Sequence, residues 1–179
     1  MARKTSLREF QQNFAKRLHD LSSHSSVSSK LGFQVGSEHY LVTLSDVSEV
    51  IPVPGTVAVP QTEPWFKGVA NVRGKLYSLV DFSAFQGGAA SAAGADRRVM
   101  LIHEKIIEGA GILVGRMLGL RNTESFTAEP AEPTPKPWIK QRYRDGNGVQ
   151  WIELDLANLA RNPVFLNVGL SQTRSPLQQ

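Results

Sequence analysis

Residues 64–82 read PWFKGVANVRGKLYSLVDF, a stretch that predicts a β-hairpin with a cation at its tip. Two apolar runs, GVANV and KLYSLVDF, flank the pair Arg73-Gly74. Glycine in a two-residue turn supplies the positive φ angle that tight hairpin turns require. Apolar side chains fall on both faces of the second run, so we expect both faces to be covered, as in a small closed barrel flanked by another layer.

Further strand patterns, separated by turn residues, lie on both sides of this hairpin. Residues 31–44 predict two strands around a polar turn at 36–38, and the sequence DGNG at 145–148 predicts another hairpin turn. The apolar runs at 97–104 and 109–118 predict one strand each. Frequent short strands with few helices indicate an all-β protein.

Loops rich in proline or glycine divide these strands into two groups. Four prolines at 52–64 exclude a helix interior or a central strand, and a small, glycine-rich loop lies at 86–96. We therefore expect two small β-barrels packed together, the first at about 31–90 and the second at about 96–157. The sequence LDLANLAR at 154–161 then predicts a short helix.

The excess positive charge lies at the N-terminus. Residues 1–30 hold six basic and two acidic residues, whereas residues 31–179 hold 14 of each. Apolar residues recur every three or four positions over 5–21, which predicts an amphipathic helix before a serine-rich linker at 22–29. We expect the apolar stripe to dock on the main domain or on a partner. Residues 173–179 are expected to form a disordered tail.

No arrangement of residues that catalysis requires is recognisable in the chain. The absence of cysteine excludes disulfides, thiolate metal sites and cysteine nucleophiles. The patterns HExxH, GxSxG and GxxxxGKS/T do not occur. Asp81, Glu153 and Asp155 follow strand patterns, where carboxylates cap turns more often than they perform acid–base chemistry. We expect no enzyme, no metal site and no cofactor.

The sequence shows neither a targeting segment nor a membrane span. The N-terminal residues MARKTSLREFQQNF contain no apolar core typical of a secretory signal. No apolar run approaches the roughly 20 residues that cross a bilayer. We therefore expect a soluble protein in the cytoplasm, without direct membrane insertion.

The residues alone leave several roles open for the cation at the hairpin tip. Aromatic and cationic side chains alternate around the hairpin, as they do in nucleic-acid-binding barrels, at Trp65, Phe66, Lys67, Arg73, Lys75 and Tyr77. The neutral charge of residues 31–179 argues against a nucleic-acid groove. In a binding module, the planar guanidinium of Arg73 suits a partner's carboxylates or carbonyls. Otherwise Arg73 solvates a tight turn.

The hairpin sequence closely resembles the central signature of the CheW-like adaptor family. That signature runs from a proline and an apolar pair through G-hydrophobic-x-N-hydrophobic-R-G to a strand that ends in Asp, as PWFKGVANVRGKLYSLVDF does. The runs LGFQVGSEHYLVTLSDVSEVI, RRVMLI, AGILV and VQWIELDL resemble the family's other strands in order, over roughly residues 31–160. The N-terminal extension, GVANVRG and the ending NPVFLNV resemble members that serve type IV pili and twitching motility.

This resemblance implies a fold, a function and a set of contact residues. It implies two five-stranded SH3-like barrels within a domain of residues 31–172. It implies an adaptor between the cytoplasmic tip of a methyl-accepting chemoreceptor and the regulatory domain of a CheA-type histidine kinase, at receptor arrays on the inner face of the membrane. A flagellar or other chemosensory pathway is the alternative. The implied receptor-facing residues are Val47, Glu49, Gly68, Arg73 and Gly74.

Two of these residues have an expected role, and one position departs from the family. By the same resemblance, Gly68 would let another backbone approach closely, and Arg73 would anchor the turn and face the receptor. The family commonly has Val-Asp after the apolar run of the second barrel, whereas this chain has Val114-Gly115.

Overall fold

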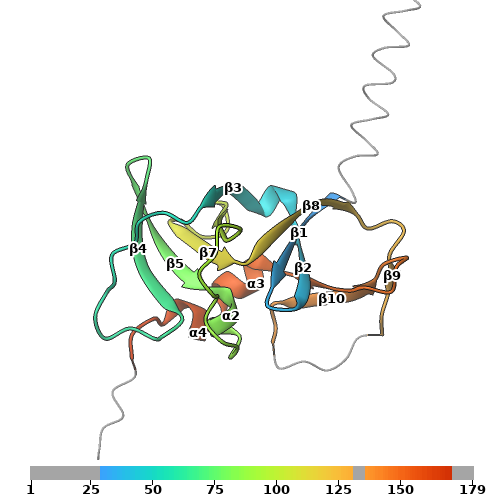
Figure 1. The fold of residues 1–179 in the computed structure, drawn as a ribbon. Coiled ribbons are helices and arrows are strands. Elements are labelled where there is room, and N and C mark those ends of the chain that lie inside the picture. The colour runs from blue at the N-terminus through green and yellow to red at the C-terminus, as the bar shows by residue number, and fades with distance from the viewer. Residues whose placement is uncertain (1–28, 131–135, 171–179) are drawn as a thin grey trace, which may run out of the picture.

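The computed structural model describes residues 29–130 and 136–170, which form two β-sheets side by side (Figure 1). The predicted helix at 5–21 and the predicted tail at 173–179 lie outside the described residues. In chain order the elements are β1 (Ser29–Val35), β2 (Glu38–Thr43), η1 (Leu44–Asp46), β3 (Val47–Pro52), β4 (Phe66–Val72), β5 (Lys75–Asp81), α2 (Phe82–Phe85), β6 (Arg98–Ile102), β7 (Ala110–Val114), β8 (Arg116–Asn122), β9 (Thr127–Ala128), β10 (Ile139–Arg144), β11 (Gln150–Leu154), α3 (Leu156–Arg161) and α4 (Pro163–Leu166).

The sheets contain six and five strands. The six-stranded sheet has the order β8-β1-β2-β11-β10-β9, and the five-stranded sheet has the order β3-β6-β7-β5-β4. Most neighbours are antiparallel, but β2 pairs with β11, and β5 pairs with β7, in parallel. The all-β class with two β-units is confirmed, and the sixth strand is the two-residue β9.

The expected division of the chain into a first barrel at 31–90 and a second at 96–157 is wrong in its strand membership. Strands β1 and β2 belong with β8 to β11, whereas β6 and β7 belong with β3, β4 and β5. The chain therefore crosses between the sheets more than once. Each sheet is built from both halves of the sequence.

Gly115 explains one of these crossings. Residues 109–118 were expected to form a single strand, but β7 ends at Val114 and β8 begins at Arg116 in the other sheet. The Gly115 amide donates a hydrogen bond of 2.9 Å to the carbonyl oxygen of Gln34. A Cβ atom at Gly115 would lie 2.9 Å from that same oxygen. Glycine thus permits the close contact at which the chain changes sheets.

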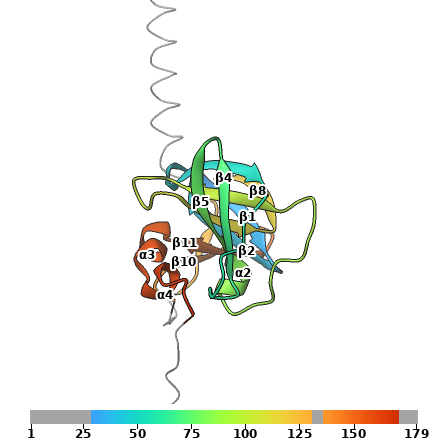
Figure 2. The same cartoon turned by 90° about the vertical axis from the view of Figure 1, so that its left-hand side faces the viewer.

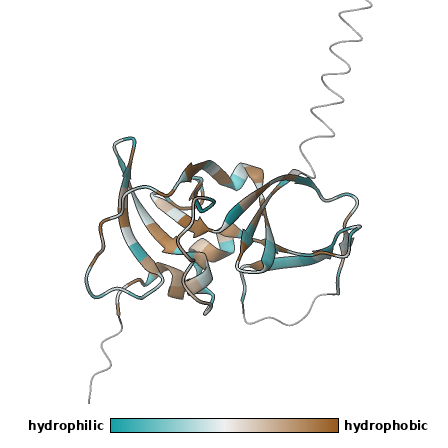
Figure 3. Ribbon diagram, in the orientation of Figure 1, coloured by the Kyte–Doolittle hydropathy of each residue, from teal (hydrophilic) through white to brown (hydrophobic). Residues whose placement is uncertain are grey.

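The main core lies between the two sheets and is mostly apolar. Figure 3 shows brown strands in the five-stranded sheet and more teal along β9 and β10. Ring contacts centre on Phe85, which packs against Trp65, Trp138 and Phe165 at centroid distances of 5.2, 5.2 and 5.4 Å. The largest fully buried apolar side chains are Tyr40, Phe33, Phe82, Leu41, Leu79, Met100, Ile112, Leu154, Leu156 and Leu159.

The short helices lie together and are capped by side chains. Figure 2 shows α3 and α4 on one side of the strands. The expected helix at 154–161 is confirmed as α3, and the Asp155 side chain accepts a hydrogen bond of 2.8 Å from the Asn158 amide. Within the described residues no helix has the length and apolar character needed to cross a membrane.

A clasp joins the end of the described chain to the proline-rich loop between β3 and β4. The Glu63 amide donates to the carbonyl of Val168 at 2.8 Å, and the Leu170 amide donates to the carbonyl of Gln61 at 2.9 Å. Thr62 and Gly169 form the antiparallel bridge between these bonds. We call the paired segments 61–63 and 168–170 the clasp.

Candidate functional site

The β4–β5 hairpin turns where the sequence predicted. Strand β4 ends at Val72 and β5 begins at Lys75, so Arg73 and Gly74 form a two-residue turn. Their φ angles are 52° and 84°, as a primed hairpin turn requires. The Gly74 amide donates a hydrogen bond of 2.8 Å to Oδ1 of Asn71.

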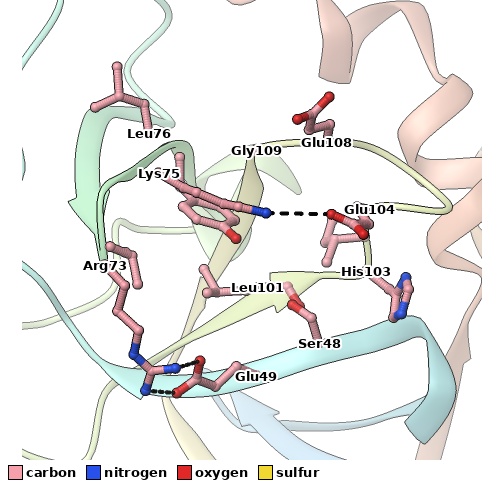
Figure 4. Close-up of a pocket in the computed structure, with 13 residues that line it drawn as sticks. Ser48, Glu49, Arg73, Lys75, Leu76, Leu101, His103, Glu104, Glu108 and Gly109 are labelled. Atoms are coloured by element: carbon pink, nitrogen blue, oxygen red, sulfur yellow. Dashed lines mark hydrogen bonds and ion pairs between the residues drawn. The ribbon is translucent and has the colours of Figure 1, made fainter.

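The tip of this hairpin is joined to strand β3 by an ion pair. Arg73 Nη1 donates to Glu49 Oε2 at 2.8 Å, and Arg73 Nη2 donates to Glu49 Oε1 at 2.7 Å (Figure 4). The two side chains are 76% and 35% exposed. Because water and salt screen exposed pairs, such a pair contributes at most about 1 kcal/mol to stability. Its two-point geometry fixes the direction of the guanidinium instead.

The ion pair spans the open side of the five-stranded sheet. Strands β3 and β4 are the two outer strands of that sheet and do not pair with each other. Glu49 lies on β3, and Arg73 follows β4 directly. The pair therefore connects two strands that no backbone ladder joins.

A cavity of about 550 Å³ lies beside this connection. Its lining includes the apolar side chains of Val72, Tyr77 and Leu101, and Arg73 and Glu49 lie along one margin (Figure 4). On another side Lys75 approaches Glu104, with 3.7 Å between Nζ and Oε2. An apolar lining between two ion pairs suits an apolar side chain of a partner that carries polar groups on either side.

One protein family matches almost all of the described residues. The CheW-like domain family matches residues 30–164. The chain belongs to that family. Residues 30–164 include every described strand, apart from the first residue of β1.

Individual CheW-like relatives agree with this assignment. The chain is 29% identical over 146 residues to protein PilI of Pseudomonas aeruginosa, which covers 79% of this chain and 80% of PilI. It is 27% identical over 108 residues to the chemotaxis protein CheW of Helicobacter pylori, covering 60% of this chain and 61% of that protein. The resemblance of the hairpin sequence to the CheW-like family is thus confirmed, and PilI is among the proteins to which the chain is similar.

A solved structure supports the fold. The crystal structure of scaffolding protein TtCheW from Thermoanaerobacter tengcongensis aligns with a TM-score of 0.65 at 20% identity, covering 76% of this chain and 94% of that chain. Membership of the CheW-like family places this protein among the scaffold and adaptor proteins of chemotaxis-type systems.

The CheW-like fold brings some of the expected contact residues together and separates others. Glu49 and Arg73 line the cavity, and Gly74 completes the turn beside them. Val47, at the start of β3, packs against the main core. The receptor-facing role of these residues stays a prediction.

Gly68 lies at the other end of β4 and makes its close backbone contact within the chain. Its φ angle is 105°, and a Cβ atom there would lie 2.0 Å from the carbonyl oxygen of Val57. The backbones of Val57 and Val69 exchange two hydrogen bonds of 2.8 and 2.9 Å. The backbone that approaches Gly68 is therefore the proline-rich loop of this CheW-like domain.

Several cavity residues were not identified from the sequence. Lys75 and Leu76 follow the turn directly, and Leu76 is 67% exposed although β5 was expected to be covered on both faces. Glu104 and Glu108 come from the connection between β6 and β7. The parallel pairing of β5 with β7 brings that connection beside the hairpin.

The burial of two of the three aromatic rings argues against the nucleic-acid hypothesis, although Tyr77 is partly exposed in the cavity. Trp65 and Phe66 are only 8% and 9% exposed, so their rings are not available to stack on bases. The guanidinium of Arg73 is hydrogen-bonded to the Glu49 carboxylate. The alternation of aromatic and basic residues around the hairpin therefore reflects a buried core next to a charged tip.

The carboxylates that follow strands have structural partners. Asp81 accepts hydrogen bonds from the Ala84 amide at 3.3 Å and from the Ser91 amide at 2.8 Å. Asp155 caps α3. Both carboxylates were expected to cap turns, and in the structure they cap the starts of the short helices α2 and α3. Among the described residues, no group of three or more His, Asp or Glu side chains could hold a metal ion.

Glu153 is buried, and its neighbours stabilise its ionised form. Oε1 accepts from Nζ of Lys30 at 2.9 Å and from Nζ of Lys140 at 3.0 Å, and Oε2 accepts from the Tyr143 hydroxyl at 2.9 Å. Burial raises the pKa of Glu153, but these hydrogen bonds outweigh it and hold the pKa below its usual value. Burial and the bond to Glu153 raise the pKa of Tyr143 to about 12.

Proposed function

We propose that this CheW-like protein is a non-enzymatic adaptor that couples a methyl-accepting chemoreceptor to a CheA-type histidine kinase. One observation carries the proposal: Arg73 and Glu49 form a two-point ion pair beside an apolar-lined cavity at the hairpin tip. These are residues that the family resemblance assigns to the receptor-facing surface. Such a preformed site suits a protein segment better than a reacting substrate.

The proposed mechanism is geometric. The hairpin tip binds the cytoplasmic tip of the receptor, and another surface binds the regulatory domain of the kinase. An adaptor that holds both in a fixed relation lets a small receptor change shift the kinase between two states. The adaptor acts in the cytoplasm, at receptor arrays on the inner face of the membrane.

The likeness to PilI supports a chemosensory system that controls type IV pili and twitching. The likeness to the chemotaxis protein CheW of Helicobacter pylori keeps a flagellar pathway as the alternative. Deletion of the gene, followed by separate scoring of twitching and swimming, distinguishes the two. Loss of twitching with normal swimming is the expected result.

Calorimetry with the full chain tests the adaptor function directly. The titrants are a soluble cytoplasmic fragment of a chemoreceptor from the same organism and the isolated regulatory domain of its CheA-type kinase. We expect both to bind. Failure of both to bind would refute the proposal.

A charge reversal at the tip tests the location of the receptor site. Arg73→Glu places two carboxylates together, so we expect the affinity for the receptor fragment to fall at least tenfold, while affinity for the kinase domain is unchanged. Circular dichroism checks that the variant is folded. Arg161→Glu is a matched control, because Arg161 is an exposed arginine in the last turn of α3. If the wild type and Arg73→Glu bind the receptor with equal affinity, Arg73 does not contact the receptor and only solvates the turn.

A further inference from the structure

The hairpin turn carries a residue that its backbone conformation disfavours. Arg73 and Gln61 are the only non-glycine residues with positive φ among those that the structure describes. A left-handed conformation costs an ordinary L-residue roughly 1–2 kcal/mol. Turns of this type favour Asn, Asp or Gly at the position of Arg73. Because the turn itself favours other residues at this position, the presence of Arg73 indicates a requirement other than the turn.

Two side chains hold Arg73 in this conformation. Glu49 binds its guanidinium from β3, at 2.8 and 2.7 Å. Asn71 acts on the backbone: its Oδ1 accepts the hydrogen bond of 2.8 Å from the amide of Gly74, the residue after Arg73. Asn71 is exposed and lies in β4, two residues before Arg73. Its side chain therefore fixes the far end of the turn while Glu49 fixes the guanidinium.

We propose that Asn71 is a positioning residue of the receptor site, an inference that rests on the proposed function. The Asn71 side chain sets the turn so that the Arg73 guanidinium reaches Glu49 and presents its remaining donors to a bound partner. A guanidinium has five N–H donors in a rigid plane. The pair with Glu49 uses two nitrogens, and the Arg73 side chain stays 76% exposed. Donors for a partner therefore remain at the surface.

Substitutions at Asn71 separate positioning from a general structural role. Asn71→Ala removes the acceptor, and Asn71→Asp keeps an acceptor at the same place. Each is made in the wild type and in an Arg73→Ala background. Calorimetry measures the affinity of each full-length variant for the soluble receptor fragment.

We expect Asn71→Ala to lower that affinity about five- to tenfold in the wild type, because the turn loses the one hydrogen bond from Asn71 that orders it. Asn71→Asp should stay within about twofold of the wild type. In the Arg73→Ala background, Asn71→Ala should have no further effect, because the residue through which it acts is gone. An equal loss in both backgrounds would overturn the inference, as would failure of Asn71→Asp to retain affinity.

A second measurement does not depend on any partner. The side-chain Nε–H signal of Arg73 in the NMR spectrum of the free protein reports its pairing with Glu49. We expect Asn71→Ala to shift this signal in the direction that Glu49→Gln does. An unchanged Arg73 signal in Asn71→Ala would overturn the inference, even if receptor affinity fell. If the wild type shows the paired Arg73 signal but binds no receptor fragment, the role of Asn71 in a receptor site fails, and if it binds no kinase domain either, the proposed function fails as well.

Discussion

Gly68 leaves less room for a side chain than any other described glycine. A Cβ atom there would lie 2.0 Å from the carbonyl oxygen of Val57, and the φ angle of 105° is one that L-residues rarely adopt. The contact seats the proline-rich loop on β4, an outer strand of its sheet. Covering an outer strand in this way removes a free edge on which another chain could add.

We expect Gly68→Ala to destabilise the protein by about 3 kcal/mol or more, because the added methyl group meets backbone and the left-handed conformation is strained. Urea denaturation measures the change in the free energy of unfolding. Gly55→Ala is the control in the same loop, since a Cβ atom at Gly55 meets nothing within 4 Å. Similar stabilities for the two variants would contradict the assigned role of Gly68.

Glu153 makes stability depend on pH in a direction that its pKa fixes. The folded state lowers the pKa of Glu153 below the value of about 4.3 in an unfolded chain. Its contribution is therefore fully present above about pH 4.3 and is lost as the pH falls through the folded-state pKa. Near neutral pH, replacing the Glu153 carboxylate with an uncharged amide leaves the Lys30 ammonium facing a buried carbonyl instead of an anion.

For Glu153→Gln we expect a loss of about 2–3 kcal/mol at pH 7, below the range for fully buried pairs because Lys140 is largely exposed. The difference from wild type should shrink as the pH is lowered from 6 to 3. Urea denaturation across that range measures it. Glu108→Gln, at an exposed position with no ion pair among the described residues, should show no such trend. A difference that stays constant with pH would rule out the ionised state of Glu153 as its cause.

At the scale of elements, the turns were predictable and the break between β7 and β8 was not. The turns at 36–38, 73–74 and 145–148 depend on local residues such as glycine and asparagine, so sequence alone located them. The run GAGILVGRML is apolar apart from Arg116, and none of its three glycines by itself marks where the chain changes sheets. The contact that divides it comes from Gln34, which is distant in the sequence.

The clasp makes the proline-rich loop depend on the C-terminal end of the described chain. We expect a chain that stops at Leu166 to lose the hydrogen bonds of Glu63 and Leu170 and to be less stable by about 1–2 kcal/mol. Amide exchange should then quicken at Val57, whose amide donates to the Val69 carbonyl at 2.8 Å. A chain that stops at Leu170 keeps the clasp and serves as the control. Unchanged exchange at Val57 after truncation at Leu166 would mean that the clasp does not hold the loop.

At the scale of the whole molecule, the sequence predicted the fold class but not how its strands are ordered, and the receptor-facing role of the expected contact residues stays a prediction. Glu49 and Arg73 were both expected at one surface through the family resemblance. The order β3-β6-β7-β5-β4 places their strands at the two outer edges of one sheet, so their pairing at 2.8 and 2.7 Å requires the sheet to curve until these edges approach each other. Strand order depends on contacts between distant segments, and a single sequence does not record these.

Cutting the chain in the glycine-rich loop tests this strand order. Fragments 1–90 and 91–179 each contain strands of both sheets, and neither contains a complete sheet. We expect each fragment alone to show an unfolded circular dichroism spectrum, and an equimolar mixture to recover strand signal. Two sequential barrels would instead give fragments that fold separately, so an independently folded 1–90 fragment would contradict the observed topology.

The parallel pairing of β2 with β11 also sets the order of events during synthesis. Tyr40 lies beside Ile152, so β2 leaves the ribosome more than a hundred residues before its neighbour. In the early β1–β2 hairpin, the side of β2 that faces away from β1 has no partner until β11 has been translated. Folding of the six-stranded sheet is therefore completed only after β11 has been translated, and until then the nascent chain has an unpaired β2 edge that a chaperone can shield.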